Sequence, residues 1–72
     1  MSNERFVGTL KTYDPLKGYG FISREKGKDV FVYFDQFSSA DGDAAAIPGC
    51  IVEFDIENRS KGPVALNVRI LG

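Results

Sequence analysis

Two neighbouring stretches decide the fold of this sequence: Gly18-Tyr19-Gly20-Phe21-Ile22 and Val30-Phe31-Val32-Tyr33-Phe34. Both are rich in the aromatic and β-branched residues that favour strands, and a polar turn around Gly27 separates them. Side chains along a strand point alternately to the two faces of a sheet. One face of this pair of strands therefore carries Ile22, Val30 and Val32, and the other face carries the aromatic side chains.

Three further strands are expected around this pair. The five expected strands cover residues 5–13, 18–24, 29–34, 50–57 and 64–70. We expect residues 35–48 to form a long loop that opens with a tight turn, and residues 58–62 to form a turn. No stretch shows the apolar spacing of an amphipathic helix.

The aliphatic side chains of the expected strands define an interior. Inward positions in the last two strands are Cys50, Val52, Phe54, Ile56, Val64, Leu66, Val68 and Ile70, with Ala65 turned outward. Five strands without a helix must protect their edges, and a short chain does so most simply by closing the sheet. We expect Gly8, Gly18 and Gly20 to permit the close backbone approach that closure needs. The sequence thus predicts one all-β domain, residues 1–72, folded as a five-stranded antiparallel β-barrel.

The composition excludes several kinds of site. The chain has no histidine and one cysteine, Cys50, so a Cys/His zinc site, an intrachain disulfide and a Ser–His or Cys–His catalytic pair are all excluded. We interpret Cys50 as a small core residue. No apolar run approaches the roughly 20 residues of a membrane span, and the first residues do not resemble a signal peptide. We therefore expect a cytoplasmic protein that is not an enzyme, with no cofactor, metal, membrane partner or small-molecule substrate.

The aromatic face predicts the function. Tyr19, Phe21, Phe31 and Tyr33 lie outside the expected barrel, where a contiguous apolar patch usually marks a binding surface. We expect Tyr13 and Phe34 to extend this patch, and lysines to surround it. Aromatic rings beside cations suit unpaired bases and their phosphates.

The charge is unevenly distributed along the chain. The net charge is −1, but residues 1–34 carry six Lys and Arg against four Asp and Glu, whereas residues 35–72 carry three against six. We interpret Glu53, Asp55 and Glu57 as a solvated strand face that repels phosphate. A ligand with phosphates is therefore expected on the other side of the barrel.

The sequence resembles the bacterial cold-shock domain family over nearly its whole length. Lys17-Gly18-Tyr19-Gly20-Phe21-Ile22 is similar to the first RNP motif of that family, and Val30-Phe31-Val32-Tyr33-Phe34 is similar to the second. Supporting matches are Gly8, Lys11, Lys28-Asp29, Pro48-Gly49, Lys61-Gly62-Pro63 and Asn67-Val68. The resemblance implies an OB-type barrel that binds single-stranded RNA or DNA, often as an RNA chaperone.

Three positions depart from the family pattern. Thr12 stands where the family usually has tryptophan, and Tyr33 replaces the usual histidine. The loop of residues 39–47 lacks the aromatic residue that most members carry there. Because each stacked base is worth roughly 1–3 kcal/mol, we expect a shorter site and weaker binding than in a typical member.

The predicted nucleic-acid-binding residues are Lys11, Tyr13, Lys17, Tyr19, Phe21, Asp29, Phe31, Tyr33, Phe34 and Lys61. The family positions of the three lysines imply contacts to phosphates or base edges. Asp29 either accepts a hydrogen bond from a base or fixes the turn before its strand. The alternative function is a protein-interaction or homodimerisation module that uses the same patch, and the chain is expected to be a monomer or a weak, strand-exchanged dimer.

Overall fold

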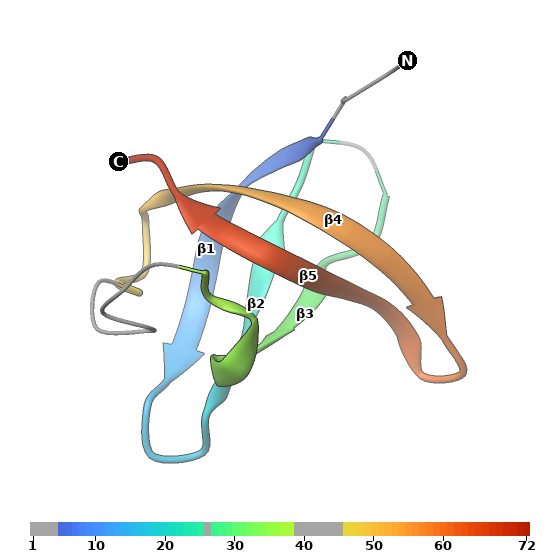
Figure 1. Ribbon diagram of the computed structural model, residues 1–72, viewed down its shortest axis with the longest axis horizontal. Helices are drawn as coiled ribbons and strands as arrows, with labels where there is room; N and C mark the ends of the chain where they lie inside the picture. The colour runs from blue at the N-terminus through green and yellow to red at the C-terminus, as the bar shows by residue number, and fades with distance from the viewer. Residues whose placement is uncertain (1–4, 26, 39–45) are drawn as a thin grey trace.

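The computed structural model describes residues 5–25, 27–38 and 46–72. Its elements are β1 (Phe6–Asp14), β2 (Tyr19–Ser23), β3 (Val30–Tyr33), the 3-10 helix η1 (Phe34–Gln36), β4 (Ile51–Arg59) and β5 (Gly62–Ile70) (Figure 1). The strands close into a barrel in the order β1-β2-β3-β5-β4, with β1 paired to β4. The predicted five-stranded all-β barrel is confirmed. In the part of the chain that the structure describes, no helix is long and apolar enough to span a membrane.

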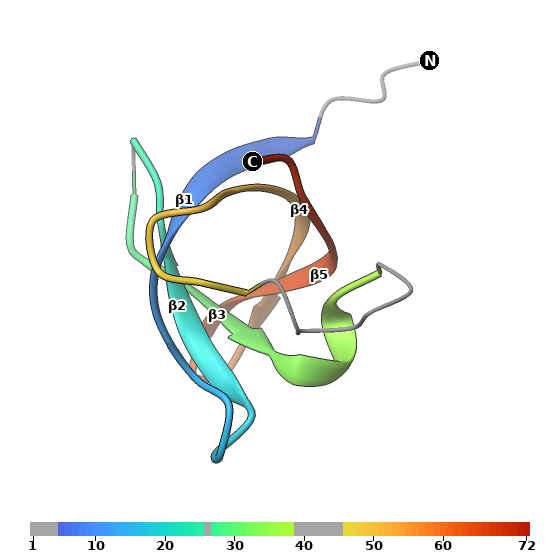
Figure 2. The ribbon, with the colours of Figure 1, turned by 90° about the vertical axis from the view of Figure 1, so that its left-hand side faces the viewer.

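The barrel consists of two halves that cross each other. The meander β1–β2–β3 forms one half and the β4–β5 hairpin forms the other, as the view in Figure 2 shows. Every strand pair is antiparallel except β3–β5, which is parallel and joined at Phe31 and Val64. The predicted antiparallel pairing holds at every ladder except this seam. A closed ring with an odd number of strands cannot alternate direction throughout, so one neighbouring pair must be parallel.

The interior contains the aliphatic side chains that the strand pattern assigned to it. Ile22, Val30, Val32, Val52 and Phe54 are fully buried. Burial of such side chains provides most of the favourable free energy of folding in a small domain. Because these side chains fill the barrel, the alternate positions of β2 and β3 must point outward.

The inward pattern expected for the last strand is wrong in one respect. Ala65 is fully buried in the core, whereas Leu66 is only half-buried. The pairing explains the difference, because β5 advances by one residue more than β4 between two successive register pairs. This β-bulge contains Asn67, whose φ is 51°. An extra residue shifts the inside–outside alternation by one, so that Val68 points inward again.

Two expected boundaries also move. The predicted turn over residues 58–62 is shorter, since Asn58 pairs with Pro63 and Arg59 with Gly62. Only residues 60–61 remain as the hairpin turn. The expected tight turn after the third strand is η1, and the remainder of the predicted loop falls partly on residues 39–45, outside the described residues. Gly18 belongs to the β1–β2 turn with a φ of 77°, rather than to β2.

The acidic face on β4 is not simply solvated. Nη1 of Arg5 lies 3.2 Å from Glu53 Oε1, and Nε of Arg5 lies 3.3 Å from Asp55 Oδ1. Nη2 of the same guanidinium donates to the backbone carbonyl of Asn67. The expectation of a solvated acidic face that repels phosphate is therefore corrected for these two carboxylates, because Arg5 pairs with both of them and also contacts the bulge at Asn67.

The strands β1 and β2 approach closely at Gly20. A Cβ atom built on Gly20 would lie 2.1 Å from the backbone oxygen of Thr12, and one on Gly8 would lie 2.5 Å from the backbone oxygen of Ser23. Neither obstacle is a flexible side chain that can turn away. The expectation that Gly8 and Gly20 permit close backbone approach is confirmed.

We predict that Gly20→Ala destabilises the barrel by about 3 kcal/mol, because the added methyl group forces the two strands apart. This is a large share of the total stability of a small domain. Urea unfolding followed by circular dichroism measures the change. The control is Gly72→Ala, where an added Cβ meets no atom within 4 Å and stability should not change. Equal midpoints for the two variants would contradict the proposed strand contact.

Candidate nucleic-acid interface

The four aromatic residues of the central strands lie on one outer face. In the antiparallel pairing of β2 and β3, Tyr19 lies opposite Tyr33 and Phe21 opposite Phe31. Residues directly opposite each other point to the same face of a sheet. The intervening pair, Gly20 and Val32, points inward and is buried. We call these four outward residues the aromatic strip.

Phe31 is the centre of the aromatic strip. Its ring centroid lies 5.1 Å from that of Tyr19 in a stacked pair, 5.0 Å from Phe21 edge to face, and 4.7 Å from Tyr33 in a tilted pair. Phe21 and Tyr33 are 37% and 40% exposed, whereas Tyr19 and Phe31 are half-buried. The rings thus support one another and present a preformed surface to solvent.

Phe34 lies at one end of the strip and is 57% exposed. Its backbone N–H donates to the carbonyl oxygen of Gly18 over 2.8 Å. Its ring packs closely against Gly18, because a Cβ atom built on Gly18 would lie 3.0 Å from Cδ1 of Phe34. Phe34 is therefore held beside the aromatic strip at the start of η1.

Tyr13 does not extend the aromatic strip. It pairs with the inward-facing Gly20, packs against the core, and meets Phe37 edge to face at 5.5 Å. The reason is a β-bulge in β1 between Leu10 and Thr12, which contains Lys11 and changes the alternation along that strand. A binding role for Tyr13 stays a prediction, and its packing gives it a structural one.

Lys11 and Asp29, both predicted contacts, lie next to each other. Nζ of Lys11 is 3.1 Å from Oδ2 of Asp29, and both side chains are well exposed. Together with Thr12 and Phe21 they line a shallow hollow of about 410 Å³. Thr12 pairs with Phe21 across the strands, so it stands on the same face as the aromatic strip. A tryptophan at that position would cover this hollow.

Lys17 is exposed in the β1–β2 turn, directly before the aromatic strip. Its backbone N–H donates to Oδ1 of Asp14 over 3.3 Å, and the N–H of Leu16 donates to the same oxygen over 2.9 Å. These bonds fix the turn and place the lysine at the end of the strip near Tyr19. The Lys17 side chain is thus available to a ligand that follows the strip.

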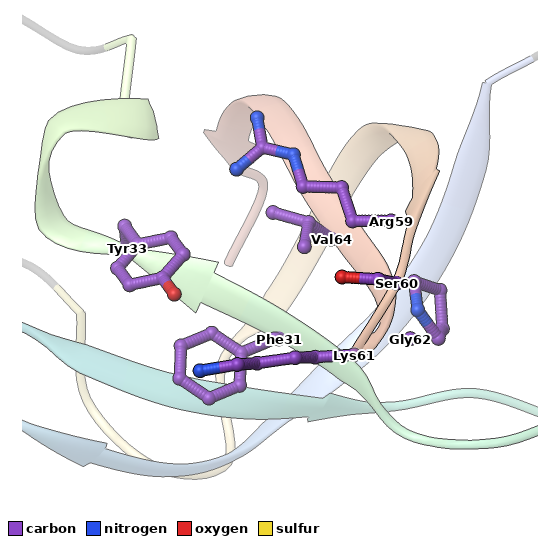
Figure 3. Close-up of a pocket in the computed structure, with 8 residues that line it drawn as sticks. Phe31, Tyr33, Arg59, Ser60, Lys61, Gly62 and Val64 are labelled. Atoms are coloured by element: carbon purple, nitrogen blue, oxygen red, sulfur yellow. The ribbon is translucent and has the colours of Figure 1, made fainter.

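A pocket of about 340 Å³ opens between the aromatic strip and the β4–β5 hairpin. It is lined by Phe31, Tyr33 and all of residues 59–64. Figure 3 shows the Lys61 side chain extending from the hairpin toward Phe31, with the hydroxyl of Ser60 turned in the direction of Tyr33. The floor is apolar and the rim carries hydroxyl and cationic groups, which is the usual composition of a small-ligand subsite.

Arg59 is a rim residue that sequence reasoning missed. Arg59 falls within the turn expected over residues 58–62, where a charged side chain has no defined direction. In the structure Arg59 is the last residue of β4 and its Nε lies 2.5 Å from Oε1 of Glu57. Side chains two residues apart on a strand point to the same face of the sheet. The spacing of Glu57 and Arg59 was therefore the signal in the sequence that the two side chains could pair.

Glu57 lies on the same surface as the aromatic strip. It pairs with Val64, and Val64 pairs with Phe31, so the three residues form one row across β4, β5 and β3. The expectation that the acidic residues of β4 face away from a bound ligand is therefore wrong for Glu57. Closure of the sheet at β3–β5 brings its carboxylate into the neighbourhood of the pocket.

Comparison with known proteins gives a consistent result. A family model described as the 'Cold-shock' DNA-binding domain matches residues 6–71. A cold shock-like protein of Aquifex aeolicus is 47% identical over 68 residues, which are 93% of this chain and 96% of that protein. Cold shock protein CspC of Bacillus subtilis is 45% identical over 62 residues, 86% of this chain and 92% of that protein.

A solved structure supports the fold. The structure described as drosophila Unr CSD456 superposes with a TM-score of 0.76 at 20% sequence identity. The match covers 96% of this chain and 27% of the solved one. At this identity the likeness concerns the arrangement of the strands.

We predict that Phe31→Ala costs about 2–3 kcal/mol of stability and Phe21→Ala about 1 kcal/mol. Phe31 loses ring contacts with three neighbours and Phe21 with one, and each aromatic pair is worth roughly 0.5–1.5 kcal/mol beyond its buried area. Urea unfolding of both variants measures the difference. If Phe21→Ala were as destabilising as Phe31→Ala, Phe31 would not be the centre of the strip.

Proposed function

The chain belongs to the cold-shock DNA-binding domain family, and from that premise we propose that it binds single-stranded RNA and DNA by stacking unpaired bases on the aromatic strip. The observation that carries the proposal is the strip itself, in which Phe21 and Tyr33 are exposed around a supporting Phe31. Any base can stack on such rings, because every base has a π-face. The contacts made this way depend little on sequence and do not require a 2′-hydroxyl.

Cations around the strip supply the contacts to phosphates. Lys17 lies at the Tyr19 end, and Lys61 lies in the pocket beside Phe31 and Tyr33. Lys11 can bind a phosphate while Asp29 accepts a hydrogen bond from a base edge, because their exposed ion pair contributes little and separates easily. We assign the phosphate contacts to these lysines and the base-edge contact to Asp29, with Phe34 as a further stacking surface.

The proposed action is passive and non-enzymatic. Binding holds bases in the unpaired state, so weak hairpins shift toward their open form by mass action. The available free energy is the difference in affinity between single strand and duplex. We propose a cytoplasmic RNA chaperone and regulator of gene expression that acts without a cofactor, as a monomer or a weak, strand-exchanged dimer.

We predict that a labelled oligo-pyrimidine strand binds saturably, with an affinity that falls as salt rises. Phe21→Ala should weaken binding about tenfold, because one stacking surface is lost. Fluorescence anisotropy at two salt concentrations measures both effects. The matched control is Phe6→Ala, which removes a 51% exposed phenylalanine that stacks on Phe54 outside the strip.

The same experiment tests the alternative in which the strip is a protein interface. An absence of binding at high micromolar protein, with Phe21→Ala still folded, would overturn the nucleic-acid proposal. A molar mass that rises with protein concentration in the wild type and not in Phe21→Ala would then establish homodimerisation through the strip.

We predict that Thr12→Trp tightens binding about tenfold. The new indole would stand beside Phe21 over the hollow that Thr12, Lys11 and Asp29 now line, and it would stack one more base. The control is Val7→Trp, on the same strand at an exposed position paired with Glu53. Equal affinities for Thr12→Trp and the wild type would show that bound bases do not reach this end of the strip.

A further inference from the structure

Arg59 lies at the rim of the pocket that joins the aromatic strip to the β4–β5 hairpin. Figure 3 shows its side chain running from the hairpin past Val64 in the direction of Tyr33. The side chain is 50% exposed, so its charge is accessible from solvent. Arg59 and Lys61 thus give the hairpin side of the pocket two cations opposite an aromatic wall.

The contact with Glu57 leaves most of the guanidinium free to bind something else. Nε of Arg59 donates to Oε1 of Glu57. A guanidinium has five N–H donors, and this contact uses one of them. The terminal nitrogens still present a planar pair of donors, a geometry that suits the oxygens of a phosphate.

Tyr33 and Arg59 line the same pocket, so a base stacked on Tyr33 would bring its backbone to the edge where Arg59 lies. We propose that Arg59 is a phosphate-binding residue of this surface, positioned by Glu57; the proposal rests on the stacking function above. Glu57 shares a row with Val64 and Phe31, so its carboxylate alone would repel the backbone of a bound strand. Arg59 neutralises that carboxylate and adds a contact of its own.

The competing explanation is that Arg59 only masks Glu57, which means that it neutralises the carboxylate and makes no contact with the nucleic acid. A double variant distinguishes the two roles, because Glu57→Gln with Arg59→Gln removes both charges and keeps the net charge of the wild type. If Arg59 binds phosphate, the double variant still lacks that contact. If Arg59 is only a mask, nothing remains to be masked and binding returns to the wild-type level.

The experiment measures the affinity for oligo-dT by fluorescence anisotropy across a salt series, for the wild type, Arg59→Gln, the double variant and Arg69→Gln. Arg69→Gln removes the same charge from a position paired with Glu53, at the other end of the hairpin ladder. One phosphate contact on a single strand contributes about 0.7 to the slope of log affinity against log salt. The slope of the double variant should fall by about this amount, and the slope of Arg59→Gln by at least as much, because Glu57 then remains without its cation. Arg69→Gln should keep the wild-type slope.

The corresponding loss of affinity in the double variant is about eightfold at 50 mM salt and about threefold at 200 mM salt. The loss shrinks because the contribution of one phosphate contact to the affinity falls to zero as salt approaches 1 M. A double variant that matches the wild type would overturn the proposal in favour of a mask. The proposal would also be overturned if the salt dependence of the affinity had the same slope for Arg59→Gln as for Arg69→Gln.

A strand that contains one guanine completes the design. A loss confined to this strand, with the slope unchanged, would mean that Arg59 reads a base edge and would overturn the phosphate assignment. Failure of the wild type to bind any strand would remove the stacking function and this inference together. Wild-type binding with an unaffected Arg59→Gln variant would remove the inference alone.

Discussion

The structure depends on the filling of a very small barrel by aliphatic side chains. Ile22, Val30 and Val32 occupy the interior from β2 and β3, and strand geometry then leaves the alternate positions no place except the outside. The aromatic strip is therefore a direct consequence of core packing. Phe31 has two roles as a result. Its half-buried ring supports its three neighbours, and it also belongs to the surface that binds. Stability and binding are thus coupled at that residue.

Strand alternation made most of the fold predictable from the sequence, and β-bulges limited it. The faces of β2 and β3 follow directly from Ile22, Phe21 and their neighbours, since no bulge interrupts these strands. In β1 and β5 one extra residue changes the alternation, which turned Tyr13 toward the core and Ala65 into it. A bulge depends on the pairing of two strands, and such pairing is not visible in the sequence of either strand alone.

The candidate site was predictable to the extent that it is local in sequence. Tyr19, Phe21, Phe31 and Tyr33 belong to one hairpin, so their common face could be derived from that hairpin. The pocket was not predictable, because it forms where β5 reaches β3 across the closed sheet. Arg59 and the true direction of Glu57 belong to this second, non-local part of the surface.

The crossing of two halves in this barrel has a thermodynamic consequence. The meander and the β4–β5 hairpin meet at the β1–β4 ladder and at one parallel seam, where Phe31 pairs with Val64. A ligand that extends from Phe21 to Lys61 touches both halves and bridges this seam. Such a ligand binds only the closed barrel, so binding and folding are linked, and occupancy raises the melting temperature in proportion to the logarithm of ligand concentration. A bound nucleic acid thereby stabilises the contact between the two halves of the barrel, and the stabilisation is lost when it dissociates.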